Sequence, residues 1–382
     1  MSLLFLALLQ LAFTLCWTVY VLFLPDLAAQ AGISKSWIVM ILMADQVIFA
    51  IMDWALGANA DRVAENMKRF GLWIAAVCAI STLAFVMLPH IAPATSAGVF
   101  IALIVVWSLS ASILRAPPLV LLSRHADLSA RPAIAAALAF GLGVAGALAP
   151  YVTLNLKGVD PRAPFLLAGL ATLIATLTLV GLPRPAVSSA TPAAIKTDPP
   201  QVPPFLIAGL LLAIGFQIHV AMNAAPRYLA FMKSPELVWW MPVFWIGFSL
   251  AVFPVSMCLK RTQPQRAIVT GAAVGAFALL FAPHMPALGL LAACEFAAGC
   301  GWAMCFLGLV QAALTLGATG HEGSIAGRLF ALFAVAIFLR LGVTLSGVAL
   351  DAAARGVLQF TAAAMWTAAA LILWRSFSMR GN

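Results

Sequence analysis

Charged residues are scarce in this chain. Asp, Glu, Lys and Arg together make up 9% of its 382 residues, whereas about a quarter of the residues are charged in soluble globular domains. Hydrophobic residues make up 64%, against roughly 45–50% in such domains. This composition excludes a soluble protein and leaves no room for a soluble domain of any size, so we expect an integral membrane protein.

Motifs of the common catalytic and metal sites are also lacking. The chain has no G-x-x-x-x-G-K-S/T loop, which argues against ATP hydrolysis, and no H-E-x-x-H zinc motif. Its six cysteines form no Cys-x-x-Cys pair and lie within or at the inner ends of apolar runs, so we interpret them as small core residues. We therefore expect no enzyme activity, no cofactor and no metal.

What the sequence does contain is apolar runs of about 20 residues, the length that crosses a bilayer as a helix. The runs lack the alternation of a β-barrel strand, as "LLFLALLQLAF" (residues 3–13) illustrates. We predict an all-α membrane protein with twelve transmembrane helices near residues 3–25, 36–57, 70–89, 98–123, 132–156, 164–183, 205–227, 237–259, 266–283, 286–316, 325–350 and 354–375.

The order of the spans predicts two six-helix bundles. Residues 1–183 form the N-terminal bundle and residues 205–382 the C-terminal bundle; residues 184–204, rich in proline, form a cytoplasmic linker that cannot sustain a helix. Thirteen Lys and Arg residues fall on the side of both termini and six on the other. Because cytoplasmic loops are enriched in Lys and Arg, we expect both termini to be cytoplasmic.

The net charge of +9 is then explained by topology and contact with anionic lipid, and we expect no nucleic-acid partner. We expect a monomer in a bacterial inner (plasma) membrane.

Six charged side chains cluster in "DWALGANADRVAENMKRFG" (residues 53–71), between the second and third spans. The pattern Gly57-x-x-x-Asp61-Arg62 resembles the loop motif G-x-x-x-D-R/K-x-G-R/K-R/K of the major facilitator superfamily, and the six-plus-six layout resembles that family over the whole chain. Residues 64–66 (Ala, Glu, Asn) depart from the motif.

The resemblance implies two pseudo-symmetric bundles and a conformational gate in which the loop acid docks on the N-terminal end of the eleventh helix. A carboxylate at a helix N-terminus is stabilised by roughly 0.3–1 kcal/mol. The gate residues so implied are Asp53, Gly57, Asp61, Arg62 and Arg328. The alternative is that these charges only terminate helices and enforce topology.

Five ionisable residues lie inside the predicted spans: Asp45, Asp53, Arg115, Glu295 and Arg340. An ionisable group at the bilayer centre costs at least ~2.5–3.5 kcal/mol and persists mainly where it faces a cavity or a partner. Their depths along the helices predict two ion pairs, Glu295 with Arg340 and Asp53 with Arg115. No basic residue is expected at the depth of Asp45.

A carboxyl group without a fixed partner in a low-dielectric site can exchange a proton. Asp45 is therefore the first candidate for proton coupling, and Glu295 the second if its ion pair opens during transport. The alternative is that both are static struts between helices.

Polar and aromatic residues near the midplane indicate a substrate site between the two bundles. His219 and Asn223 lie one turn apart on a single helix face, with Gln217 about 200° away. Trp17, Trp245 and Trp302 fall inside spans, away from the membrane interfaces, and can form an apolar wall. The candidate substrate-binding residues are Trp17, Arg115, His219, Asn223, Trp302 and Arg340; helix packing is the alternative role for each.

Two further features mark individual spans. Pro117 and Pro118 are expected to kink the fourth span. Gly141, Gly143 and Gly146 in the fifth favour either close helix packing or a distant resemblance to the Gly-Pro motif of the family's antiporters.

The favoured function is secondary active transport of a small organic solute by alternating access, coupled to protons. The two intramembrane arginines favour an anionic or zwitterionic solute. One alternative is a proton-driven antiporter that exports amphipathic compounds. The other is a membrane receptor or assembly factor that has the fold but does not transport.

Overall fold

The structure is a computed structural model that describes residues 1–63, 67–123, 130–182, 201–317, 321–348 and 351–378; the side chains of residues 60–63, 67–70, 123 and 377–378 are not described. Within these ranges the regular structure is helical, and twelve helices or helix groups are long and apolar enough to cross a membrane. The prediction of an all-α protein with twelve spans is therefore confirmed.

The helices of the N-terminal half are α1 (Ser2–Gln30), α2 (Ile38–Val63), α3 (Met67–Ile91), α4 (Ala97–Ala111), α5 (Ala116–Ser123), α6 (Arg131–Leu156) and α7 (Arg162–Gly181). Helices α4 and α5 form one span, interrupted by the 3₁₀ turn η3 (Ser112–Leu114). The interruption directly precedes Pro117 and Pro118, whose missing N–H groups and ring clashes break the helix ahead of them. Arg115 lies at this break.

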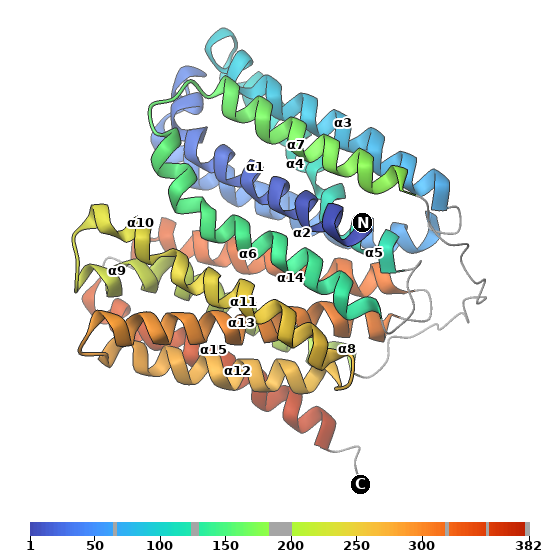
Figure 1. The fold of residues 1–382 in the computed structure, drawn as a ribbon. Coiled ribbons are helices and arrows are strands. Elements are labelled where there is room, and N and C mark those ends of the chain that lie inside the picture. Colours follow the sequence, from blue (N-terminus) through green and yellow to red (C-terminus); the bar gives the residue numbers. More distant parts are fainter. Residues whose placement is uncertain (64–66, 124–129, 183–200, 318–320, 349–350, 379–382) are drawn as a thin grey trace.

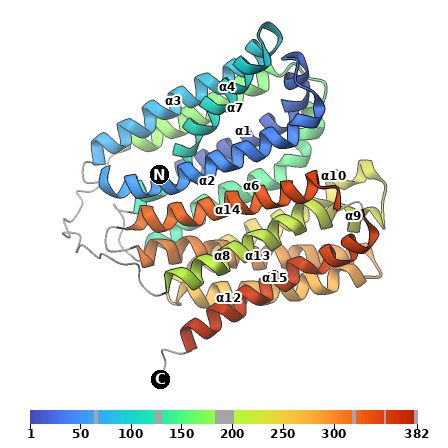
Figure 2. The ribbon, with the colours of Figure 1, turned by 180° about the vertical axis from the view of Figure 1, so that it is seen from behind.

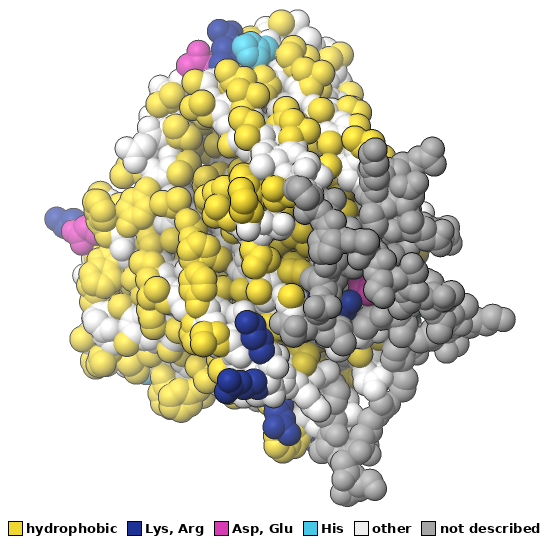
Figure 3. Space-filling model, turned by 45° about the vertical axis from the view of Figure 1, so that its right-hand side comes forward, with side chains coloured by type: hydrophobic (Ala, Val, Ile, Leu, Met, Phe, Trp, Pro, Cys, Tyr) yellow, Lys and Arg dark blue, Asp and Glu magenta, His cyan; other side chains and the backbone are white. Residues whose placement is uncertain are grey.

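The helices of the C-terminal half are α8 (Val202–Ile218), α9 (Ala224–Leu229), α10 (Leu237–Trp240), α11 (Pro242–Leu259), α12 (Pro264–Phe281), α13 (Leu288–Leu316), α14 (Glu322–Leu345) and α15 (Ala352–Ser378). A π-helical segment, η5 (His219–Asn223), joins α8 to α9 in one span. Figure 3 shows that one face of the molecule is mostly hydrophobic, with charged side chains in a few small groups.

Two helix pairs connect the halves. Helix α2 packs along α14, and α6 packs along α11 (Figure 1, Figure 2). Small residues permit both contacts: Gly143 and Gly146 of α6 lie against Phe248 and Trp245 of α11. Close packing, one of the two explanations offered for the glycines of this span, therefore accounts for them.

Candidate functional site

A cavity of about 210 Å³ lies between the two halves, and we call it the central cavity. Its walls come from α1, α2, α6 and the α4–α5 break on one side and from α8, α11, α13 and α14 on the other. The lining residues are Gln10, Phe13, Thr14, Trp17, Gln46, Phe49, Arg115, Leu138, Leu142, Ala213, Phe216, Gln217, Trp245, Trp302, Phe306, Phe330, Phe333 and Ile337.

Aromatic side chains dominate this lining. Nine of its eighteen residues are Phe or Trp, and several repeat at helical spacing, so that one face of a helix presents successive rings. The rings of Phe216 and Trp302 stack with their centroids 4.4 Å apart and their planes 6° apart. Trp17, Trp245 and Trp302, the three tryptophans selected from the sequence as wall residues, all line the cavity.

Arg115 is the single charged residue among the described residues of this lining. Its Nε lies 3.0 Å from Oδ2 of Asp53, a fully buried carboxylate on α2. Its Nη2 donates to the carbonyl oxygen of Phe330 on α14, 3.2 Å away. The guanidinium also lies over the rings of Phe49 and Phe330, 5.0 and 5.9 Å from their centroids. The predicted Asp53–Arg115 pair is confirmed and lies within the N-terminal half, while the hydrogen bond from Arg115 to Phe330 connects the two halves.

Asp45 is buried behind the aromatic wall of the N-terminal half. The Tyr20 hydroxyl donates to its Oδ2 at 2.8 Å and the Ser108 hydroxyl to its Oδ1 at 2.6 Å. The Tyr20 ring packs against Trp17, which lines the cavity, and against Trp107, and these two tryptophans also stack on each other. No basic group in the described part of the chain forms an ion pair with Asp45. Depth alone predicted that Asp45 has no basic neighbour, which holds for the described residues; its two hydroxyl partners were not predicted.

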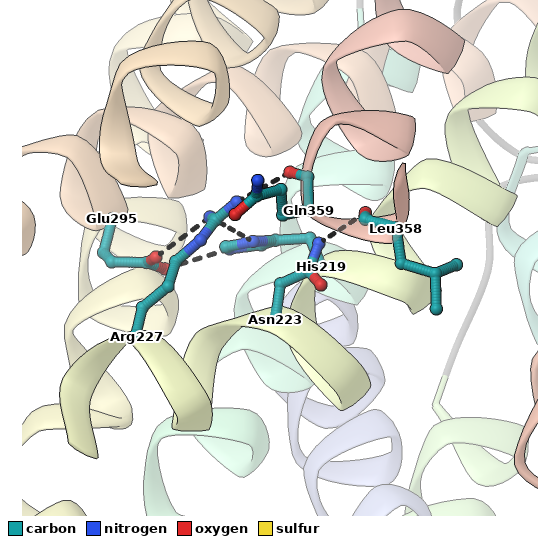
Figure 4. A network of polar contacts seen from close by, with 6 residues as sticks. All are labelled: His219, Asn223, Arg227, Glu295, Leu358 and Gln359. Carbon is teal, nitrogen blue, oxygen red and sulfur yellow. Dashed lines mark hydrogen bonds and ion pairs between the residues drawn. The ribbon is translucent and has the colours of Figure 1, made fainter. Parts of the chain in front are cut away.

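Glu295 lies in a polar cluster inside the C-terminal half (Figure 4). Its Oε2 is 2.9 Å from Nε2 of His219, and its Oε1 is 3.9 Å from Nη1 of Arg227. The prediction that Glu295 pairs with Arg340 is therefore wrong. Depth along a helix gives the level of a side chain in the membrane but not its direction around the helix axis. Glu295 on α13 points to the α8–α9 span.

The rest of this cluster ties α8–α9 to α15. Arg227 donates to the carbonyl oxygen of Gln359 at 2.8 Å, and Asn223 donates to that of Leu358 at 3.0 Å. His219, Asn223 and Arg227 follow one another at four-residue intervals. The π-helical segment widens this turn through its i→i+5 bonding, which keeps His219 and Asn223 in register on one face.

His219 and Asn223 lie away from the residues that line the central cavity, whereas Gln217, on the opposite face of the helix, lines it. Arg340 does not line the cavity either; it follows Ile337, a lining residue, by one turn of α14. Its Nε is buried and has no hydrogen-bond partner in the part of the chain that the structure describes.

The gate residues lie near the end of the bundle where α7 ends and α8 begins, which we call the linker end. Gly57 of α2 abuts Gly323 and Gly327 of α14, and a Cβ atom on Gly57 would lie 2.7 Å from Cα of Gly327. The backbone of Asp53 also meets Gly327. The side chains of Asp61 and Arg62 lie outside the described residues. Arg328 donates from Nε to the carbonyl oxygen of Ser324. The role of these residues as a gate stays a prediction.

Two further contacts hold the halves together at the linker end. Arg131 at the start of α6 donates to the carbonyl oxygen of Leu314 and lies 3.3 Å from Oε1 of Glu322. Ser256 of α11 donates to the carbonyl oxygen of Pro132. The linker end is thus closed by direct polar and glycine-mediated packing between the halves.

Substituting alanine for Gly57 is expected to open the linker end. The added methyl group collides with the backbone of α14, and overpacking of this kind costs about 1–3 kcal/mol. Because the collision lies between the halves, separation relieves it without unfolding, and the population of the open form should rise about 5- to 150-fold. The measurement is the electron–electron dipolar distance between spin labels at Ala130 and Lys260, with the exposed Cys258 replaced by serine.

Gly98→Ala is the matched control for this experiment, because a Cβ atom at Gly98 meets nothing within 4 Å. An unchanged distance distribution in Gly57→Ala would contradict the expected opening.

Several residues of these sites were not selected from the sequence. Arg227 was counted as an outer-loop cation because the apolar run was expected to end there; α9 continues to Leu229 and buries it. Tyr20 and Ser108 belong to residue types that are ordinary in apolar helices, so nothing in the sequence distinguished them. Gln46 is an uncharged polar residue inside a span, as Gln217 is, and this signal could have found it. Groups of three or more potential metal ligands are absent from the residues that are described.

Comparison with solved structures identifies the fold, whereas comparison with family models and curated sequences does not. No protein-family model matches the chain, and no curated protein sequence is similar to it. Its structure is similar to the crystal structure of the human organic anion transporter MFSD10 (TETRAN), with 14% identity, a TM-score of 0.71 and coverage of 97% of this chain and 98% of that one. It is also similar to a bacterial homologue of the iron transporter ferroportin in an outward-facing state, with 12% identity, a TM-score of 0.74 and coverage of 99% and 100%.

Proposed function

Because the chain has the fold of the major facilitator superfamily, we propose that it is a secondary active transporter that moves a small organic solute by alternating access. The observation that carries this proposal is the central cavity, which both halves line and which lies between the two helix pairs that join them. Pivoting of the halves about these pairs would expose the cavity to each side of the membrane in turn.

Protons are the coupling ion in this proposal, and Asp45 is the group that carries them. It is a buried carboxyl group held by two hydroxyl donors and separated from the cavity by the layer of Trp17 and Tyr20. A hydroxyl group can accept as well as donate a hydrogen bond, so Tyr20 and Ser108 can accommodate either protonation state of Asp45. Glu295 is the second candidate, with His219 as its neighbour.

Asp45→Asn is expected to abolish solute accumulation driven by an imposed pH gradient, because the amide cannot release a proton. Exchange of solute across the membrane without a gradient should persist, since the cavity lining is unchanged. The measurement is uptake by purified protein in liposomes, with and without the gradient.

Asp26→Asn, at an exposed acid of α1, is the control. Undiminished uphill accumulation in Asp45→Asn would refute the assignment of Asp45. Failure of the wild-type protein to move any solute would favour a receptor or assembly factor that only has the fold.

Proton-driven export of amphipathic compounds is the second candidate function. The aromatic lining favours it, because such a surface accommodates apolar and flat molecules. The sequence favoured an anionic solute because two arginines lie inside spans. The ion pair of Arg115 with Asp53 weakens that argument, since it balances the charge of one of them. Inside-acidic and outside-acidic gradients in the same liposomes separate uptake from export.

A further inference from the structure

We propose that the solute held in the central cavity is an uncharged aromatic molecule of one or two rings, hydrogen-bonded by the indole N–H of Trp302 and the amide of Gln46. This inference rests on the proposed function and names the class of its solute. Four observations carry it: the charge balance of the lining, the ring geometry, two unpartnered polar atoms and the volume.

The lining carries no net charge when its ion pair is included. Arg115 is neutralised by Asp53, and its remaining donor capacity is directed partly to the Phe330 carbonyl oxygen. An anion at Arg115 would share the guanidinium with the Asp53 carboxylate, so it would meet a cation whose charge is already balanced. A cationic solute would have no carboxylate to pair with among the lining residues. Cation–π attraction to the aromatic rings is weaker than the free energy lost when a cation is removed from water.

Stacked rings line one wall of the cavity. Phe216 lies parallel to Trp302 at 4.4 Å, and Trp302 stacks in turn near Trp366 at 5.7 Å with planes 24° apart. Trp17 of the opposite half lies edge-on to Phe49. A planar solute can therefore contact ring faces or edges from both halves at once.

Two lining residues each have a buried polar atom without a partner. Trp302 is 3% exposed and Gln46 is 1% exposed, and neither Nε1 of Trp302 nor Oε1 of Gln46 has a hydrogen bond in the described part of the chain. The neighbouring Trp366 shows the usual arrangement, since its Nε1 donates to the carbonyl oxygen of Leu212 at 3.0 Å. Both atoms are covered in this conformation, so a solute with one acceptor and one donor would satisfy them, from opposite halves, once the two side chains turn toward it.

The volume limits the size of the solute. A cavity of about 150 Å³ engineered in another protein holds one benzene molecule, and the central cavity measures about 210 Å³. One or two rings with a small polar substituent fit this space, whereas long acyl chains or sugars of several units do not.

Three compounds of the same shape and different charge test the inference: naphthalene-2-carboxamide, naphthalene-2-carboxylate and naphthalene-2-carboxamidinium. Binding to the purified wild-type protein in detergent is measured by equilibrium dialysis and by the rise in melting temperature with ligand concentration. The carboxamide should bind at least about tenfold more tightly than either ion, which is a difference of about 1.4 kcal/mol.

Trp302→Phe keeps the stacking ring and removes the N–H group, so it should weaken carboxamide binding by about five- to tenfold, the value of one hydrogen bond. Gln46→Met should weaken it similarly. Trp37→Phe, at an exposed tryptophan outside the cavity, should leave binding unchanged. The melting temperatures of the unliganded variants show that each is folded.

Preferred binding of the carboxylate or the carboxamidinium overturns the inference, and so does the absence of binding by all three compounds. Carboxylate binding that is lost in Arg340→Gln would show an anion site instead. Transport is measured separately from binding. If the carboxamide binds but no solute crosses the liposome membrane, the proposed function is wrong and this inference stands. If solutes cross the membrane but charged compounds bind best, this inference is wrong and the proposed function stands.

Discussion

Replacing Glu295 by alanine should lower the free energy of unfolding by about 3–5 kcal/mol, the cost of removing one partner from a buried ion pair. The substitution leaves Arg227 and His219 inside the C-terminal half without the carboxylate that both contact. It also weakens the connection between α8–α9 and α15, which depends on Arg227 being held over the Gln359 carbonyl oxygen. Denaturant unfolding of the purified protein in mixed micelles measures the change.

Glu236→Ala, at an exposed acid before α10, is the control and should change the stability little. The double variant Glu295→Ala/Arg227→Ala should cost less than the sum of the two single variants, because no unpaired charge remains. Additive effects, or wild-type stability in Glu295→Ala, would show that the cluster does not act as a unit.

The fold could be predicted because it depends on features that the sequence carries directly. Apolar length fixes the spans, and the scarcity of charge excludes every soluble alternative. Pro117 and Pro118 account for the break in the fourth span, because two successive prolines remove two N–H donors from one turn. A single proline is tolerated elsewhere in the bundle, as Pro150 inside α6 and Pro254 inside α11 show. The Asp53–Arg115 pair was predictable for a related reason: both residues lie at one depth on spans of the same half.

The direction in which a side chain points around a helix could not be predicted. Glu295 and Arg340 share a depth, yet Glu295 meets the span that carries His219 and Arg227. The π-helical segment adds to this difficulty, since it shifts the face of every residue that follows it. The helix also ends two residues later than the expected end at residue 227. A constant helical period cannot anticipate such a shift.

The sequence could predict which types of residue line the cavity, but not which individual residues do so. Tryptophans inside spans pointed to an aromatic wall, and three of them line it. Gln46 follows Asp45 directly in the sequence, and only the structure shows that the amide reaches the cavity while the carboxylate turns back to Tyr20 and Ser108. Adjacent residues on a helix point about 100° apart, so one polar pair can serve two different sites.

Replacing Arg115 by methionine should cost about 3–5 kcal/mol of stability, because Asp53 is left fully buried without its cation. The same substitution removes the donor to the Phe330 carbonyl oxygen and with it one polar contact between the halves. Stability alone cannot separate these two effects, since both are lost together in the single variant. Unfolding in mixed micelles gives the first effect, and the distance between labels at Ala130 and Lys260 gives the second.

The double variant Asp53→Leu/Arg115→Met separates them. Replacing a buried ion pair by apolar residues of similar volume is often neutral or stabilising by about 1–4 kcal/mol, so the double variant should regain the stability that Arg115→Met loses. It does not regain the hydrogen bond from the α4–α5 break to α14, so its linker end should still open more readily than that of the wild type. Recovery of both properties would mean that the ion pair holds α2 to the α4–α5 break and plays no part in closing the halves. Recovery of stability alone would mean that Arg115 contributes to the gate through its contact with α14.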